Sequence, residues 1–137
     1  KNNGIKTVKI DITDTEQLKE LPQVDYVIGF EILEHLPNPE QLLFLLKNKV
    51  SKGIIFSVPN TGYYLHRLRL LFGRFPLQWV THPGEHLRFW TKKDMKNWLQ
   101  EIGFANNKIF MYQGMPIFKK IWPSMYAQGM CVYLQIK

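Results

Sequence analysis

The sequence has little of what would fix a fold covalently or anchor it in a bilayer. It contains a single cysteine, Cys131, which excludes an internal disulfide and indicates a reducing compartment, so we expect a cytoplasmic protein. No apolar run approaches the length that spans a membrane. A P-loop, a G-x-S-x-G nucleophile elbow and paired-cysteine motifs are also missing, which argues against the protein classes that need them.

A glycine-rich loop is missing too. The nine glycines are scattered, and none of them form the G-x-G-x-x-G series with which nucleotide-binding α/β domains approach a cofactor. The chain also begins with Lys rather than Met. We therefore expect a truncated domain, the C-terminal portion of something longer, which is inactive alone and has weak or no affinity for a nucleotide-like cofactor.

Acidic residues are scarce in the second half of the chain. Residues 1–62 carry seven Lys/Arg against eight Asp/Glu, whereas residues 63–137 carry eleven against three. Such a basic half suits an acidic partner, nucleic acid or an anionic membrane surface, and a solvated basic face is the simpler explanation. The length of 137 residues and the 45% hydrophobic content indicate one globular domain, residues 1–137.

The most informative stretch that is present runs from Asp25 to Leu36 and reads D-Y-V-I-G-F-E-I-L-E-H-L. A strand pattern, Val24–Phe30, begins one residue before this stretch and passes without a spacer into an acidic helical turn. The strand is nearly all apolar, which is typical of strands covered on both faces. Ligands of open α/β sheets bind at the carboxyl ends of parallel strands, so this junction predicts a ligand cleft.

Strand and helix patterns alternate along the chain. We expect strands at Val8–Ile12, Val24–Phe30, Ile54–Val58, Asn107–Tyr112 and Met130–Ile136, and helices at Thr15–Leu21, Gln41–Val50, Tyr63–Phe72 and Met95–Ile102. Capping signals, Asn38-Pro39-Glu40 and Thr91–Asp94, precede two of the helices. Residues 63–90 and 114–129 are expected to hold a lid, loop or insertion. The alternation predicts a parallel sheet whose last two strands pair antiparallel.

Four segments occur in an order and spacing that point to one enzyme family. They are Asp25–Leu36, Gly53–Gly62 (G-I-I-F-S-V-P-N-T-G), Arg67–Pro76 (R-L-R-L-L-F-G-R-F-P) and Glu85–Phe104, which opens E-H-L-R-F-W-T. Together they resemble class I S-adenosylmethionine-dependent methyltransferases, and the last two resemble the subgroup that includes the methionine-biosynthesis protein W type. The resemblance covers about residues 5–112. It implies a Rossmann-like α/β sheet that lacks its first two strands and is mostly parallel, with an antiparallel C-terminal strand.

The resemblance implies methyl transfer from S-adenosylmethionine, with S-adenosylhomocysteine as product. By the family's pattern, Asp11 would accept a hydrogen bond from the adenine amino group and Ile12 would pack on the ring, while Phe30 and Glu31 would lie beside the cofactor. Each acidic or aromatic residue also has a simpler explanation. Asp11 suits a turn, Phe30 suits the core, and Glu31 suits the first turn of a helix.

Two histidines are candidate catalytic groups, because histidine titrates near neutral pH. They are His35, for which a packing role is the better alternative, and His86. The candidates for substrate contact are Asn60, Arg67, His86 and Arg88. Turn formation, a polar helix face and local loop anchoring explain the same residues. His82 and His86 are four apart, but Pro83 and Gly84 between them spoil a helical pair, so no metal is expected.

The sequence does not identify the molecule that accepts the methyl group. Arginines suit phosphate or carboxylate, and together with nearby aromatics they would form a basic surface made of Tyr63, Tyr64, Arg67, Arg69, Arg74 and Trp79. We therefore expect a small-molecule or lipid-like acceptor and contact with an anionic surface. The alternative function is a non-catalytic basic module that binds anionic membrane or nucleic acid. An open sheet edge would also favour a homodimer.

Overall fold

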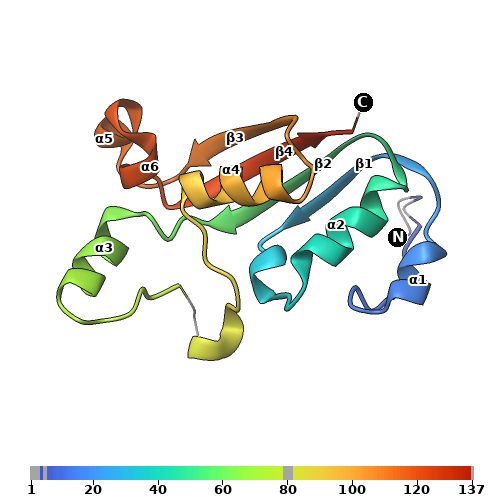
Figure 1. The fold of residues 1–137 in the computed structure, drawn as a ribbon, viewed down its shortest axis with the longest axis horizontal. Helices are drawn as coiled ribbons and strands as arrows, with labels where there is room; N and C mark the ends of the chain where they lie inside the picture. Colours follow the sequence, from blue (N-terminus) through green and yellow to red (C-terminus); the bar gives the residue numbers. More distant parts are fainter. Residues whose placement is uncertain (1–3, 5, 79–81, 137) are drawn as a thin grey trace.

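The computed structural model describes residue 4, residues 6–78 and residues 82–136, which form an open four-stranded sheet flanked by helices (Figure 1). The strands are β1 (Val24–Phe30), β2 (Val50–Pro59), β3 (Asn107–Tyr112) and β4 (Gly129–Gln135). The helices are α1 (Thr15–Lys19), α2 (Pro39–Lys47), α3 (Tyr64–Leu71), α4 (Lys92–Glu101), α5 (Pro116–Ile121) and α6 (Pro123–Tyr126), with short 3-10 turns η1 (Leu33–His35) and η2 (Pro83–Glu85). No described helix has the length and apolar character needed to cross a membrane.

The order of the strands in the sheet is β1-β2-β4-β3. β1 and β2 pair in parallel, and β4 runs antiparallel to both β2 and β3. It follows that β1, β2 and β3 all end at the same edge of the sheet. The predicted α/β fold with an antiparallel final strand is confirmed, and that final strand lies inside the sheet rather than at its edge.

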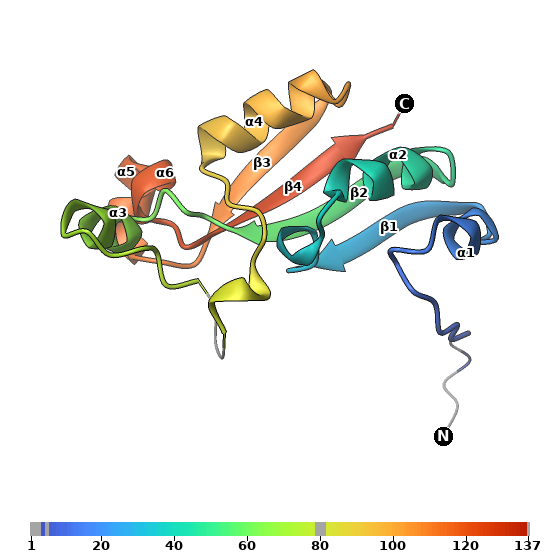
Figure 2. The same cartoon turned by 60° about the horizontal axis from the view of Figure 1, so that its bottom comes forward.

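The core lies between one face of the sheet and two helices, α2 and α4 (Figures 1 and 2). Leu43 of α2 and Met95 and Leu99 of α4 are almost completely buried against apolar side chains of β2 and β4. The helix starts are partly as predicted. Thr91 and Asp94 form the expected capping box at α4, whereas the Asn38 side chain makes no capping hydrogen bond at α2.

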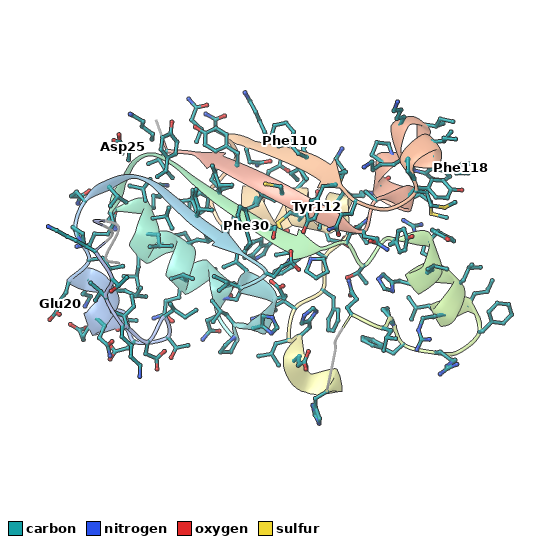
Figure 3. All side chains as sticks on the ribbon, turned by 180° about the vertical axis from the view of Figure 1, so that it is seen from behind. Glu20, Asp25, Phe30, Phe110, Tyr112 and Phe118 are labelled. Carbon is teal, nitrogen blue, oxygen red and sulfur yellow. The ribbon has the colours of Figure 1, made fainter. Side chains whose placement is uncertain are left out.

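The opposite face of the sheet is open among the described residues. Figure 3 views this face, which presents Phe30, Phe110 and Tyr112. The expectation that β1 is covered on both faces was therefore wrong, since Tyr26 and Ile28 keep 47% and 60% of their surface exposed. Their apolar character reflects a strand with one packed face and one uncovered apolar face.

The predicted strand Val8–Ile12 is also wrong, because these residues form no strand. The backbone turns instead: the Asp11 carboxylate accepts hydrogen bonds from Thr13 N (2.8 Å) and Thr13 Oγ1 (2.7 Å). The segment is not part of the described sheet, in which β1 is an edge strand, so its alternating pattern joins no ladder. Ile12 nevertheless lines an apolar hollow together with Gly29, so the segment lies close to β1.

Residues 63–90 and 114–129 contain more helix than a plain loop would. α3 (Tyr64–Leu71) matches the predicted Tyr63–Phe72 helix to within one residue at each end, and Gly73, whose φ is +68°, follows its C-cap. None of its residues is buried, so its leucines do not join the core. Residues 114–129 form α5 and α6, and Figure 2 shows these two helices beside α3 at one end of the molecule, where Tyr64 contacts Tyr126.

Candidate functional site

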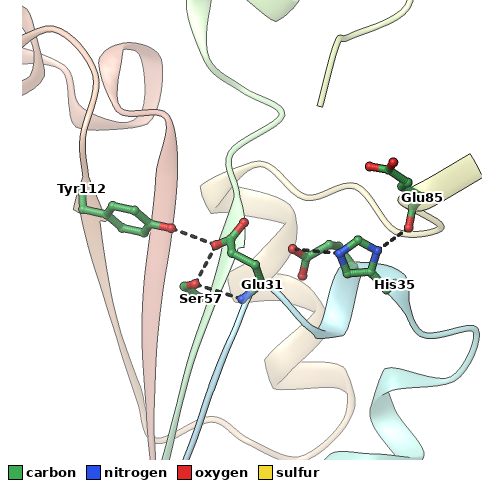
Figure 4. A network of polar contacts seen from close by, with 6 residues as sticks. Glu31, His35, Ser57, Glu85 and Tyr112 are labelled. Atoms are coloured by element: carbon green, nitrogen blue, oxygen red, sulfur yellow. Dashed lines mark hydrogen bonds and ion pairs between the residues drawn. The ribbon is translucent and has the colours of Figure 1, made fainter. Parts of the chain in front are cut away.

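A group of polar side chains gathers where β1, β2 and β3 end, at the edge of the sheet where ligands of α/β folds bind (Figure 4). β1 runs directly into Glu31, whose φ of +51° turns the chain out of the strand. A positive φ is uncommon outside glycine, and such positions cluster at functional sites. The Asp25–Leu36 stretch thus places Glu31 at the predicted cleft.

The Glu31 carboxylate joins the ends of three strands. Its Oε1 accepts hydrogen bonds from Ser57 Oγ of β2 (2.6 Å) and from the Tyr112 hydroxyl of β3 (2.8 Å). Its backbone N–H donates to the Ser57 carbonyl oxygen (3.1 Å). Two hydroxyl donors on one oxygen hold the carboxylate in a fixed direction.

Burial raises the pKa of Tyr112 to about 12; the hydrogen bond from Ser57 opposes this rise, and the nearby Glu31 charge adds to it. At neutral pH the phenol therefore keeps its proton and serves as a donor to Glu31. Glu31, Ser57 and Tyr112 therefore form a fixed group of polar side chains beside the end of β1.

Glu34 lies one turn later and has the opposite surroundings. Its side chain is completely buried, and neither carboxylate oxygen has a hydrogen-bond partner among the described residues. Burial raises the pKa of Glu34 to about 8, with a further contribution from the negative charge of Glu31. The segment that covers it is held by the Glu34 carbonyl oxygen, which accepts from the backbone N–H groups of Leu87 (2.7 Å) and Arg88 (3.1 Å).

The side chains of His35 and His86 pack against each other beside Glu34. Their rings pack edge to face with centroids 4.7 Å apart. His35 Nδ1 contacts the Glu85 carbonyl oxygen, while its Nε2 lies 3.9 Å from Glu34 Oε1. Burial, together with the neighbouring His35, lowers the pKa of His86, so its imidazole is neutral at neutral pH.

Three of these side chains have the chemistry of a metal-binding set. One ligand atom each from Glu34, His35 and His86 lie within 4.8 Å of one another. As a metal ligand, His86 was considered from the sequence only together with His82. The His82 Nδ1 instead accepts a hydrogen bond from Gly84 N (2.9 Å) and caps η2. The partner of His86 comes instead from the end of β1, 51 positions earlier in the chain.

The candidate substrate residues are mostly engaged in local structure. Asn60 is buried, and its amide bonds the carbonyl oxygens of Ser124 (3.1 Å) and Ala127 (2.8 Å), so it fastens the α6 region to the end of β2. Arg67 Nε donates to the Gly62 carbonyl oxygen (2.7 Å). Arg88 Nη2 contacts the Pro37 carbonyl oxygen, which ties the 85–90 segment to the start of α2.

The candidate cofactor residues are only partly assembled. Phe30 is 58% exposed at the end of β1, beside Glu31. Asp11 is exposed with its pKa held low by the hydrogen bonds from Thr13, and Ile12 lines the hollow near Gly29. Tyr63, Tyr64, Arg67, Arg69 and Arg74 belong to α3 or flank it, whereas Trp79 lies outside the described residues.

Sequence reasoning missed Ser57, Tyr112 and a role for Glu34. Ser57 and Tyr112 lie at the ends of correctly predicted strands, and polar residues there are a usable signal once the three ends are known to meet. Glu34 was passed over because an acid in a helical turn usually faces solvent.

Comparisons with known proteins agree with this geometry. Residues 2–109 match a family model described as a methyltransferase domain. An ubiquinone biosynthesis O-methyltransferase from Glaesserella parasuis is 28% identical over 116 residues, which is 81% of this chain and 46% of that protein. A small RNA 2'-O-methyltransferase from Caenorhabditis elegans is 30% identical over 82 residues, which is 58% of this chain and 17% of that protein. The chain thus spans less than half of the length of these curated relatives.

Solved structures show the same fold. A SAM dependent methyltransferase from Archaeoglobus fulgidus superposes with a TM-score of 0.64 and 20% identity, over 93% of this chain and 66% of that one. A small RNA methyltransferase superposes with a TM-score of 0.56 and 18% identity, over 88% of this chain and 15% of that one. At such identities the likeness is one of fold.

Proposed function

The chain belongs to the methyltransferase domain family, and from that premise we propose that its protein transfers a methyl group from S-adenosylmethionine to an acceptor. The observation that carries the proposal is the polar group at the common end of β1, β2 and β3. There Glu31 is fixed by Ser57 and Tyr112, and His35 and His86 face one another. This is the edge at which an α/β sheet of this kind binds its ligands.

The described residues fit part of such a cofactor. The exposed Phe30 ring suits contact with an apolar or aromatic surface, and the exposed Asp11 carboxylate suits an amino donor. The sequence offers no glycine-rich loop for close backbone approach. We therefore propose that Asp11, Ile12, Phe30 and Glu31 contact the cofactor with weak affinity, and that this chain alone is inactive.

S-adenosylmethionine supplies an electrophilic methyl group, which forms a bond to the acceptor as the bond from sulfur breaks. The protein's part is to position the acceptor and to remove its proton. His86 is the better base of the two histidines, because it is neutral at neutral pH and the His35 Nδ1 is engaged with Glu85. Glu31 would orient the acceptor or the cofactor through its fixed carboxylate.

For the acceptor we propose a small or lipid-like molecule in a cytoplasmic setting. The two curated relatives above are named for ubiquinone biosynthesis and for small RNA, and these names differ too much to choose between acceptors. The three candidate substrate residues would act on the acceptor indirectly, through the segments that they hold in place. These segments are residues 63–90, held by Arg67 and Arg88, and residues 114–129, held by Asn60. A homodimer through the open β1 edge is part of the proposal, and a monomeric mass in light scattering at high concentration would contradict it.

The test uses S-adenosylhomocysteine and saturation-transfer NMR, which detects weak ligands. We expect saturation transfer to the adenine protons at millimolar ligand, and weaker transfer in Phe30→Ala. Phe110→Ala is the matched control, because Phe110 is exposed to 57% on β3, at the opposite edge of the sheet from β1. Loss of one aromatic contact corresponds to roughly 0.5–1.5 kcal/mol, or about 2- to 12-fold in affinity.

Two results would overturn the assignment. One is the absence of any transfer to millimolar S-adenosylhomocysteine in the unaltered, folded chain. The other is an equal effect of Phe30→Ala and Phe110→Ala, since the contact would then be unrelated to the end of β1.

A further inference from the structure

We propose that α5 anchors the protein to the surface of an anionic lipid bilayer, with its isoleucines in the lipid and its lysines among the head groups. The observation that carries the proposal is the exposure of large apolar side chains on this six-residue helix. The inference depends on the surface of α5 and does not rest on the proposed methyl transfer.

The apolar side of α5 faces solvent. Ile117 and Ile121 keep 73% and 79% of their surface exposed, and they lie four positions apart, on the same side of the helix. Trp122, which follows the helix as its C-cap, is 54% exposed. Single exposed apolar residues are ordinary, but a group of them marks a surface that binds a protein or a membrane. The exposed side of α5 is therefore a contact surface.

The helix is held in place by its own neighbours before any contact with lipid. The Phe118 ring packs on that of Tyr126 in α6, with centroids 5.2 Å apart, and Tyr126 packs on Tyr64 of α3 at 5.6 Å. The Met115 backbone N–H donates to the Tyr126 carbonyl oxygen (3.0 Å). Figure 3 shows Phe118 with these helices at one end of the molecule. An element that is already ordered loses little conformational entropy when it binds.

The charges on and around α5 have one sign. Lys119 and Lys120 lie between the two isoleucines, and residues 108–136 contain no Asp or Glu. Residues 63–78, which include the neighbouring α3, contain none either. A lysine keeps its ammonium group among polar head groups while its apolar stem lies along lipid. Because basic residues next to a bilayer are attracted by anionic lipids, this end of the molecule favours an anionic surface over a neutral one.

Lipid fits this surface better than nucleic acid does. Nucleic acid is bound by basic groups and by aromatic rings on which bases stack. Ile117 and Ile121 offer neither a charge nor a ring, so they gain only by leaving water. Tryptophan is enriched where membrane lipid meets water, because its ring is apolar and carries one polar N–H group. Trp122 directly follows Ile121 and thus suits that boundary.

The experiment measures binding of the whole chain to lipid vesicles. Vesicles of equal parts phosphatidylglycerol and phosphatidylcholine are the anionic probe, and vesicles of phosphatidylcholine alone are the neutral one. We expect the chain to bind the anionic vesicles at least about tenfold more tightly. The double variant Ile117→Ala with Ile121→Ala should weaken binding to anionic vesicles at least about tenfold, because two large apolar side chains no longer leave water.

Depth of insertion is measured with brominated lipids, which quench the fluorescence of tryptophans that enter the lipid. The chain has four tryptophans, of which Trp90 belongs to the core and should not respond. We expect quenching in the unaltered chain and a clear loss of quenching in Trp122→Phe. Unchanged quenching in this variant would overturn the role of α5, since another tryptophan would then be the one in lipid.

The matched control is the double variant Ile28→Ala with Phe110→Ala. These two residues are 60% and 57% exposed on the open face of the sheet, so the control removes similar apolar surface at another place. It should keep the affinity of the unaltered chain for anionic vesicles. Circular dichroism checks that both double variants are folded, which we expect because all four side chains are largely exposed.

The proposal would be overturned if the unaltered chain did not bind anionic vesicles, or if it bound neutral vesicles equally well. Equal losses in the two double variants would also overturn it, because any exposed apolar surface would then suffice. Binding of single-stranded RNA that depends on Ile117 and Ile121, without binding to vesicles, would assign this surface to nucleic acid instead.

Discussion

Two glutamates three positions apart, Glu31 and Glu34, illustrate how surroundings divide the roles of identical side chains. Glu31 accepts two hydroxyl hydrogen bonds, while Glu34 is buried and has its pKa raised to about 8. Pairs of titratable groups whose environments separate their pKa values often carry different roles in one site. Here Glu31 is a polar group held in a fixed direction, and Glu34 is a buried group that needs a proton or a cation.

The residue His66 gives a prediction for the pH dependence of stability. Burial, followed by the charge of Arg69, lowers its pKa below the ordinary 6.5. Between the folded and unfolded pKa values the unfolded chain binds more protons, so this residue's contribution to stability is lost as the pH falls below about 6.5. As the pH is lowered below about 6.5, we expect the unfolding free energy of the unaltered chain to fall relative to that of His66→Asn. The difference should change by less than about 1.4 kcal/mol per pH unit.

Urea unfolding at a series of pH values between about 5 and 8 measures this difference. The variant lacks only the titrating ring, so the other ionisable groups cancel in the comparison. Parallel stability curves over the whole range would contradict the prediction.

At the scale of elements, two glycines with the same backbone conformation differ in what surrounds them. Gly103 after α4 and Gly114 after β3 have φ values of +80° and +83°. A Cβ atom at Gly103 would meet nothing within 4 Å, whereas one at Gly114 would lie 2.0 Å from the Tyr126 carbonyl oxygen. Gly114 therefore permits the close contact that holds α6 against the end of β3.

We predict that Gly103→Ala costs about 1–2 kcal/mol of stability, the cost of a left-handed conformation for a residue with a side chain. Gly114→Ala should cost about 1–3 kcal/mol more, because the Tyr126 backbone must also move. Thermal and urea unfolding of both variants measure the difference, and equal losses would show that α6 shifts at no cost.

The elements that the sequence predicted well are those whose signals are local. β1 was predicted at its observed bounds, and the Thr91–Asp94 box marked the start of α4 correctly. Val8–Ile12 failed because alternation alone does not make a strand, and this segment joins no ladder of the described sheet. The packing of α3 was equally unpredictable, since its leucine stripe resembles that of a core helix and yet remains exposed.

The candidate site shows the same division between local and long-range information. The junction after β1 indicated Glu31 and His35, because a strand end is visible in the sequence. The link from Glu31 to Tyr112 spans 81 positions and depends on the antiparallel β4 being inserted between β2 and β3. Such long-range pairings leave no local pattern, so the Ser57 and Tyr112 contacts required the fold.

At the scale of the whole molecule, charge and exposed apolar surface coincide at one end. There α3 exposes Leu71 and α5 exposes Ile121, to 76% and 79%, next to basic side chains that include Arg67 and Lys120. Residues 63–78 and 108–136 contain no Asp or Glu. A surface with both basic and large apolar side chains suits an anionic membrane better than nucleic acid, because the apolar groups gain by entering lipid.

We predict that the chain binds vesicles that contain anionic lipid and that added salt weakens this binding. Replacement of Arg67, Arg69 and Arg74 by Gln should reduce the affinity at least about tenfold, since each basic residue near such a surface contributes about 1 kcal/mol and some of this is lost to local contacts. The matched control replaces Lys92, Lys93 and Lys96 of α4, which removes the same charge at another place. Sedimentation with vesicles measures both. Equal loss in the two triple variants would show that net charge alone, and not this end of the molecule, attracts the membrane.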